Sequence, residues 1–468
     1  MPDQINPFGP ITNNSEEISA IPQAANPGLV VTPTAKKSFP KALFFVVLIL
    51  IVLGLVYFIF FRGNKAATSS GEIVWWGLWE DEATISPLIN EYEARNPKVK
   101  IKYIKQSKQD YRERLTTALT KENGLDIFTF HNSWVPMFKN HLDPIPASTM
   151  TPSEFSQVFY PVMVNDLTSG TGILGIPLGY DALTLFINND IFANSGKNSP
   201  TTWDDLRSLA RELTRKDETG TIIQSGVALG RTENIDHWQE ILALMMLQNG
   251  ADLTNPTGKL AEDALTFYTL FSSLDGVLDA SLPNSTAMFA GGKLAMYLAP
   301  SWRVFEILQL NPALNFKTVP VPQLAKGSIG QKGVVYATYW VQGVSNKSKN
   351  KLAAWDFLKF VSSKDALSKI YANSIKQRSF GEAYPRIDMA PLLTDHLILG
   401  SIVSQAPDAR SWYLQSRTFD GPTGINSLIN KYFEDAVNAV NSRDTAVKVL
   451  PTVAQGVLQV LKQYGIAR

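Results

Sequence analysis

The chain has 468 residues, a formal net charge of +1 and 18% charged residues. Because nucleic-acid-binding surfaces need clustered positive charge, this near-neutral composition disfavours nucleic acid as a partner. The sequence has no cysteine, which excludes disulfides, thiolate metal sites, a cysteine nucleophile and a lipid anchor on cysteine.

The N-terminal part divides into a polar tail and an apolar run. Residues 1–41 are rich in proline, asparagine, serine and alanine, and we expect a disordered tail. Residues 42–61 (ALFFVVLILIVLGLVYFIFF) contain no charge and are long enough to cross a bilayer core of roughly 30 Å. We therefore expect a single transmembrane helix at 42–61, with a linker at 62–71.

Charges around the apolar run favour a cytoplasmic N-terminus. Three lysines precede the run and two basic residues follow it: Lys36, Lys37 and Lys41, then Arg62 and Lys65. The large soluble part is then extracytoplasmic, and a single membrane pass attaches it to the cell membrane. Cleavage near Ala67 is the alternative, which would make the run a signal peptide.

The next segment alternates strand and helix patterns. A β-branched and aromatic run at 72–76 predicts a buried strand, and apolar residues at helical spacing follow from Ile85 to Tyr92. A half-exposed strand at 99–103, a helix from Tyr111 to Gly124 and a strand at 125–130 come next. This β-α-β-α-β order predicts an open, mostly parallel sheet, whose ligands lie beyond the carboxyl ends of its strands.

Further helices are expected near 202–213, where Thr202 is a suitable N-cap, near 350–361, and from Ile425 onward. A soluble part of this length exceeds one hydrophobic core, so two lobes are expected.

The sequence after the apolar run resembles the extracellular solute-binding proteins of bacterial ABC importers, in the sugar-binding family that includes maltose-binding protein. The blocks that carry the resemblance lie at 73–79, 88–97, 125–127, 175–177, 181–188, 200–206, 226–230, 287–289, 292–296 and 300–302. The chain departs from the family's pattern at Leu125, where a proline is usual, and at 376–378, where Lys-Gln-Arg replaces Pro-Ala-Arg. The usual lipid-anchored cysteine is missing, and the apolar run would replace it.

The resemblance implies an α/β, two-lobed periplasmic-binding-protein fold (type II), preceded by the transmembrane helix. The expected lobe 1 comprises 72–180 and about 342–376, and lobe 2 comprises about 184–338 and 380–468. Crossings are expected near 180–183, 339–342 and 374–380. The partners would be a carbohydrate ligand and ABC permease subunits with a separate ATPase. We expect a monomer with no cofactor, no metal site and no catalytic residue.

Sugars present hydroxyl rims and C–H faces, so their sites combine aromatic planes with charged or amide groups. Candidate residues of these types lie after the first and third predicted strands and at the expected crossings, and others match the family motifs. The predicted ligand-binding residues are Trp76, Trp79, Glu80, Asn132, Trp134, Tyr180, Asp181, Trp302, Tyr339, Trp340 and Arg378. By motif, Asp181 matches an acidic cleft residue of the family and Trp302 matches its stacking tryptophan.

Three alternatives remain open. The chain could be a membrane-anchored, glycan-active enzyme that uses two carboxylates. It could be a binding protein that serves a sensor or an attachment function. It could also bind a peptide, a polyamine or iron with the same fold. The ten tryptophans favour a carbohydrate ligand.

Overall fold

The computed structural model of the chain describes residues 71–121, 124–170, 172–325 and 333–467. The predicted tail (1–41), the predicted transmembrane helix (42–61) and nearly all of the predicted linker (62–71) lie outside these residues. Within the described ranges, no helix combines the length and the apolar character that a membrane crossing needs.

The first of two large sheets has the strand order β2-β1-β3-β14-β4, and β7 also pairs with β14. Its strands are β1 (Gly71–Gly77), β2 (Val99–Lys105), β3 (Ile127–His131), β4 (Leu142–Asp143), β7 (Ile176–Pro177) and β14 (Trp340–Ser345). Strand β1 runs parallel to β2 and β3, and helices α2 (Glu82–Arg95) and α3 (Tyr111–Thr120) connect these three strands. The predicted β-α-β-α-β order is confirmed.

The second sheet has the order β15-β13-β8-β11-β10-β9, with β12 paired to β8. Its strands are β8 (Asp181–Asn188), β9 (Arg215–Lys216), β10 (Ile222–Val227), β11 (Leu294–Pro300), β12 (Phe316–Val319), β13 (Val335–Thr338) and β15 (Ala409–Arg410). Every residue of β8 and β11 is buried, and most of their side chains are apolar. A separate small ladder joins β5 (Thr168–Ser169) to β6 (Gly172–Ile173).

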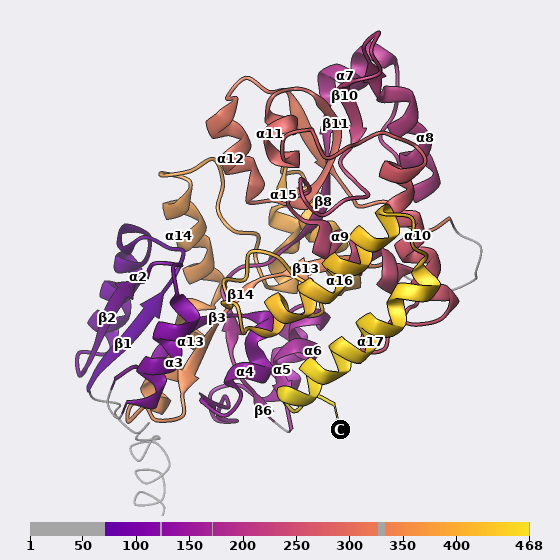
Figure 1. Ribbon diagram of the computed structural model, residues 1–468. Coiled ribbons are helices and arrows are strands. Elements are labelled where there is room, and N and C mark those ends of the chain that lie inside the picture. Colours follow the sequence, from indigo (N-terminus) through magenta and orange to yellow (C-terminus); the bar gives the residue numbers. More distant parts are fainter. Residues whose placement is uncertain (1–70, 122–123, 171, 326–332, 468) are drawn as a thin grey trace, which may run out of the picture. The chain divides into compact units, whose positions relative to one another are not determined.

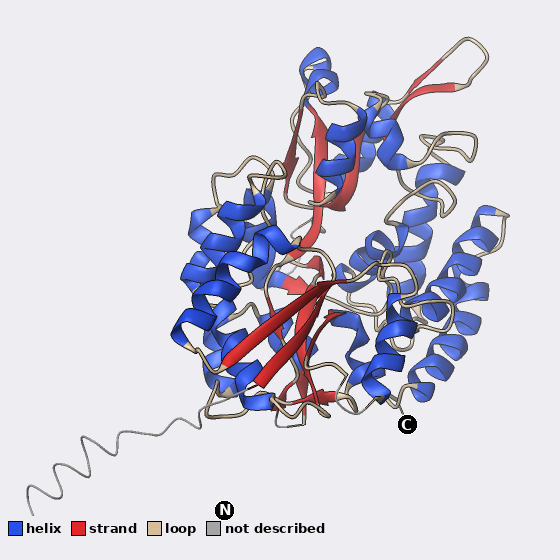
Figure 2. Ribbon diagram, turned by 90° about the vertical axis from the view of Figure 1, so that its left-hand side faces the viewer, coloured by secondary structure: helices blue, strands red, loops and turns tan. Residues whose placement is uncertain are grey.

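Helices flank the strands on both sides, as Figure 2 shows. The remaining α-helices are α4 (Val135–Phe138), α5 (Pro152–Val158), α6 (Pro161–Leu167), α7 (Asn189–Ser195), α8 (Trp203–Leu213), α9 (Trp238–Gln248), α10 (Lys259–Ser273), α11 (Ser285–Ala290), α12 (Arg303–Leu310), α13 (Lys351–Val361), α14 (Lys364–Ser374), α15 (Leu399–Gln405), α16 (Ile425–Asn441) and α17 (Ala446–Gln463). Short 3-10 turns are η1 (Asn132–Trp134), η2 (Ile387–Leu392) and η3 (Ala406–Asp408).

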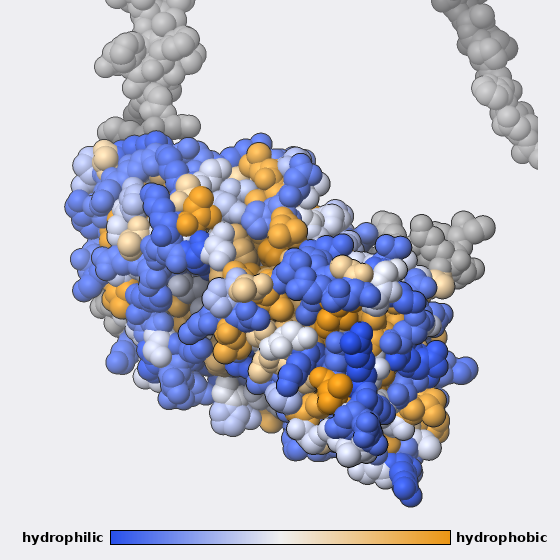
Figure 3. Space-filling model, turned by 90° about the horizontal axis from the view of Figure 1, so that it is seen from above, coloured by the Kyte–Doolittle hydropathy of each residue, from blue (hydrophilic) through white to orange (hydrophobic). Residues whose placement is uncertain are grey.

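The start of α8 confirms the predicted cap. The Thr202 side chain accepts a hydrogen bond from the backbone N–H of Asp205, and the Asp205 carboxylate accepts one from the backbone N–H of Thr202. This reciprocal pair satisfies backbone donors that the first helical turn leaves free. On the face of the molecule that Figure 3 shows, hydrophobic residues form scattered patches within a mainly hydrophilic surface.

The chain passes between the two sheets at short connections. It leaves the first sheet after β7 and enters the second at β8, and it returns from β13 to β14 through Tyr339. Figure 1 shows β13 and β14 in the middle of the described chain, between the other strands of the two sheets. A third segment approaches the first connection, where the Tyr180 N–H donates to the Ala383 carbonyl at 2.9 Å.

A partly buried carboxylate holds the connection at Tyr339. Asp166 on α6 accepts hydrogen bonds from Tyr339 Oη at 2.7 Å, Asn132 Nδ2 at 3.0 Å and Ser411 Oγ at 2.6 Å. Burial raises the pKa of Asp166 to about 6, although these hydrogen bonds act in the opposite direction. Asp166 therefore links the turn η1 after β3, the β13–β14 connection and the segment after β15.

Candidate ligand-binding site

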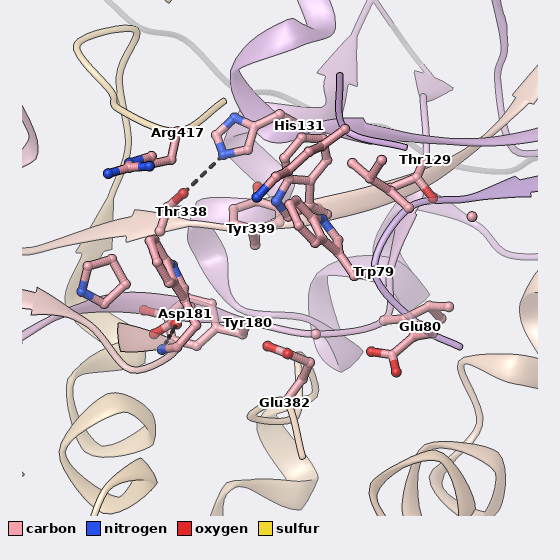
Figure 4. A pocket seen from close by; sticks show the side chains of 18 of the residues that line it. Trp79, Glu80, Thr129, His131, Tyr180, Asp181, Thr338, Tyr339, Glu382 and Arg417 are labelled. Carbon is pink, nitrogen blue, oxygen red and sulfur yellow. Dashed lines mark hydrogen bonds between the residues drawn. The ribbon is translucent and has the colours of Figure 1, made fainter. Parts of the chain in front are cut away.

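A cavity of about 670 Å³ lies where the two sheets meet. It is lined by the residues that follow β1, by the ends of β3, β11, β13 and β14, and by residues after α14 and β15. Eight of the eleven predicted site residues line it: Trp79, Glu80, Tyr180, Asp181, Trp302, Tyr339, Trp340 and Arg378. Figure 4 shows several of them around the cavity. Their role in binding remains a prediction.

Two indoles form an aromatic corner of the cavity. The ring centroids of Trp79 and Trp340 lie 5.3 Å apart in an edge-to-face arrangement, and Trp79 is 39% exposed. Trp340 rests with edge-to-face contacts on His131 at 5.0 Å and on Trp134 at 5.5 Å. Because His131 and Trp134 are buried, they support the Trp340 ring from behind before a ligand enters.

A buried charge network lies behind Trp302. The Arg303 guanidinium lies 4.6 Å from the centre of the Trp302 ring. Its Nε donates to His237 Nε2 at 2.8 Å, and its Nη2 lies 3.2 Å from Asp236. Burial holds the pKa of His237 below its usual value, so this imidazole accepts the hydrogen bond in its neutral form. His237 and Asp236 thus hold the Arg303 guanidinium, and this guanidinium makes a cation–π contact with the Trp302 ring.

Asp181 at the start of β8 is occupied by protein donors. Its carboxylate accepts hydrogen bonds from the Ser301 N–H at 3.1 Å, Ser301 Oγ at 2.9 Å and the Ala182 N–H at 2.7 Å. The Trp302 N–H lies 3.4 Å away. Burial, with a smaller contribution from the charge of Glu382, raises the pKa of Asp181 to about 7. The arrangement makes Asp181 a cap for the turn that carries Trp302.

Two glutamates share one arginine at the side of the cavity near α14. Arg378 Nη1 lies 3.0 Å from Glu382 and Nη2 lies 3.5 Å from Glu80. The guanidinium also lies 5.3 Å from the centre of the Phe305 ring. Burial raises the pKa of Glu80 to about 7, although the charge of Arg378 opposes that shift. These groups can donate to and accept from ligand hydroxyls.

Three predicted residues do not line the cavity. Trp76 points to the opposite face of β1 from Trp75, because side chains alternate along a strand. Asn132 is buried and holds Asp166 and the backbone of Tyr339. Trp134 is fully buried between Tyr111 and Phe138, where it supports Trp340. Asn132 and Trp134 therefore support the cavity wall from behind.

Several residues of the cavity wall were not predicted from the sequence. They are His131, His237, Glu240, Arg303, Glu306, Glu382, Arg417 and Phe419. The sequence Asp-His-Trp-Gln-Glu at 236–240 could have indicated two of them, since His237 and Glu240 are three residues apart and would share a helix face. No local pattern marks Phe419, which reaches the cavity only because the segment before α16 folds back toward Trp79.

The cavity suits binding by hydrogen bonds and aromatic contact. His131 is an unsuitable proton carrier near neutral pH, because burial lowers its pKa to about 3. Its ring instead bonds Thr338 Oγ1 at 3.0 Å, as Figure 4 shows. Among the residues that the structure describes, no cluster of three or more histidine or carboxylate side chains could hold a metal ion.

Comparison with known proteins finds one family match and several relatives. The family model for bacterial extracellular solute-binding proteins matches residues 76–367. A binding protein of Brucella abortus is 22% identical over 334 residues, which is 68% of this chain and 77% of the relative. The multiple sugar-binding protein of Streptococcus mutans is 22% identical over 62% of this chain and 71% of its own length.

Solved structures show the same fold. The sugar-binding protein MalE of Xanthomonas citri superimposes with a TM-score of 0.68 and 18% identity, over 84% of this chain and 98% of that protein. Likeness at this identity establishes the two-lobed α/β periplasmic-binding-protein architecture. The family match spans more than half of the sequence. The chain therefore belongs to the bacterial extracellular solute-binding protein family.

Proposed function

We propose that this protein binds an oligosaccharide outside the cytoplasm and delivers it to an ABC importer by closing its two lobes on the ligand. The observation that carries the proposal is the wall of the cavity. Trp79, Trp340 and Trp302 offer indole surfaces, while Glu80, Glu382 and Arg378 offer charged hydrogen-bonding groups. The cavity volume also falls within the range of roughly 300–1,000 Å³ that is common for small-molecule sites.

The same proposal includes the lobe boundaries and the anchor. Lobe 1 would comprise 72–180 and about 342–376, and lobe 2 about 184–338 and 380–468. The apolar run at 42–61 would tether them to the cell membrane. The permease and its ATPase would be separate chains, because residues 1–468 contain no nucleotide-binding motif. The protein would act as a monomer without catalysis.

Calorimetric titration of the full-length chain against mono- and oligosaccharides tests the proposal. We expect at least one oligosaccharide to bind, and Trp302→Ala to weaken its binding tenfold or more because an aromatic contact is lost. Trp76→Ala is the matched control, since Trp76 is half-buried on β1 and outside the cavity.

The other outcomes are equally informative. Absence of binding across the saccharide panel would contradict the carbohydrate assignment and direct the search to peptides, polyamines and metals. Consumption of a bound saccharide over hours would support the glycan-active enzyme instead. Equal losses in Trp302→Ala and Trp76→Ala would show that the cavity is not the binding site.

A further inference from the structure

Two residues of the cavity wall have a backbone conformation that side chains disfavour. Arg417 has φ of 56° and Phe419 has φ of 55°, and both line the cavity. A residue with a Cβ adopts this left-handed region only where its surroundings hold it there, and such positions cluster at ligand clamps. We call residues 416–419 the clamp loop.

The clamp loop is fixed at both ends by buried carboxylates. Before it, the Ser416 N–H and Oγ donate to Glu240 Oε1 at 2.6 and 2.8 Å. After it, the Asp420 carboxylate accepts from the Asn426 N–H and from Ser427 Oγ, both at 2.7 Å. Glu240 belongs to α9, and the other two partners begin α16. Two separate elements thus hold the left-handed conformation.

The loop presents an aromatic ring and a cation to the cavity. The Phe419 ring centre lies 6.0 Å from that of Trp79, and Lys108 Nζ lies 5.4 Å from the Phe419 ring centre. Arg417 is half exposed, and its Nη2 lies 3.4 Å from Asp236, which also pairs with Arg303. The guanidinium of Arg417 therefore retains donors for a ligand.

The clamp loop also lies outside the part of the chain that the family model matches, residues 76–367. Figure 4 places Arg417 and Glu80 on opposite sides of the cavity, so the loop contributes a wall that the predicted residues do not.

We propose that the clamp loop determines which saccharide the cavity accepts. Phe419 packs beside Trp79 against the C–H face of one sugar unit, and Arg417 donates hydrogen bonds to the hydroxyls of that unit. The inference rests on the proposed carbohydrate function and deepens it. A charge-assisted hydrogen bond contributes enough to discriminate between sugars that differ in one hydroxyl.

Two substitutions at Phe419 separate the effect of losing the ring from the effect of relieving the backbone conformation. Phe419→Ala and Phe419→Gly both remove the ring, but glycine alone relieves the unfavourable φ. In the full-length chain we expect both variants to bind the preferred saccharide about tenfold more weakly. We expect the glycine variant to have the higher urea midpoint of the two. Phe267→Ala, which removes a half-buried ring on α10 outside the cavity, is the control and should retain wild-type affinity.

Arg417→Gln tests selectivity. Calorimetry with two saccharides that differ only in the configuration of one hydroxyl should give a wild-type preference for one of them. In the Arg417→Gln variant, we expect the ratio of the two dissociation constants to fall about tenfold or more.

The outcomes separate this inference from the proposed function. If the wild-type chain binds no saccharide, both are overturned. If it binds and either Phe419 variant binds equally well, only the clamp-loop inference is overturned. The same holds if Arg417→Gln weakens every saccharide by the same factor and leaves the preference unchanged.

Discussion

The hydrogen bonds of the Asp181 carboxylate indicate a structural role that its position in the sequence did not reveal. It lines the cavity, but Ser301 and Ala182 already occupy its oxygens. A carboxylate with this many protein donors has little capacity left for a ligand. We therefore interpret Asp181 as the residue that positions the Trp302 turn, rather than as a direct sugar contact.

Asp181 should make stability depend on pH. Burial raises its pKa to about 7, whereas the unfolded chain has a value near 3.9. The folded state therefore binds a proton that the unfolded state has lost. This stabilisation is complete below about pH 4 and disappears as the pH rises through 7.

Asp181→Asn removes that titration. We expect the free energy of unfolding of the variant to depend less steeply on pH between 4 and 7, by up to about 1.4 kcal/mol per pH unit. Urea unfolding of both proteins at intervals across this range measures the difference in slope. Because the amide also loses an acceptor, the slope and not the absolute stability is the test. Parallel curves would contradict the assignment.

Elements with strong periodicity could be predicted from the sequence. The strand expected at 99–103 is β2 (Val99–Lys105), and the helix expected near 350–361 is α13 (Lys351–Val361). The residues that line the cavity were harder to predict from the sequence. Whether an indole lines the cavity or supports it depends on contacts between distant segments, such as Trp134 with Tyr111. The placement of Phe419 depends on how two carboxylates hold its loop, which no local pattern encodes.

The start of α16 should couple helix stability to binding. Asp420→Ala removes the acceptor for the first turn of α16 and should cost about 1–2 kcal/mol of unfolding free energy. It should also weaken saccharide binding, because the clamp loop loses one anchor. Thr202→Ala removes a comparable cap from α8 and should cost about 1 kcal/mol without affecting binding. Calorimetry and urea unfolding of both variants distinguish the effects. Unchanged affinity in Asp420→Ala would show that the loop does not depend on this anchor.

At the scale of the whole molecule, a bound saccharide should contact both sheets at once. Binding at 100 times Kd would stabilise the protein by about 2.7 kcal/mol. Hydrogen exchange should then slow together in three segments: the residues after β1, the turn before α12 and the clamp loop. The hairpin between β9 and β10 lies outside the cavity wall and is the internal control. Protection confined to one sheet would contradict closure around a shared ligand.

The position of β14 has a consequence for synthesis of the protein. This strand lies between β3 and β4 in the first sheet, although it is translated after almost the whole second sheet. Until Trp340–Ser345 can pair with it, β3 has an open edge whose backbone groups could pair with another chain. The first sheet therefore cannot be completed co-translationally in chain order. That edge is exposed while the second sheet is made, so we expect the incomplete chain to depend on chaperones more than its final stability suggests.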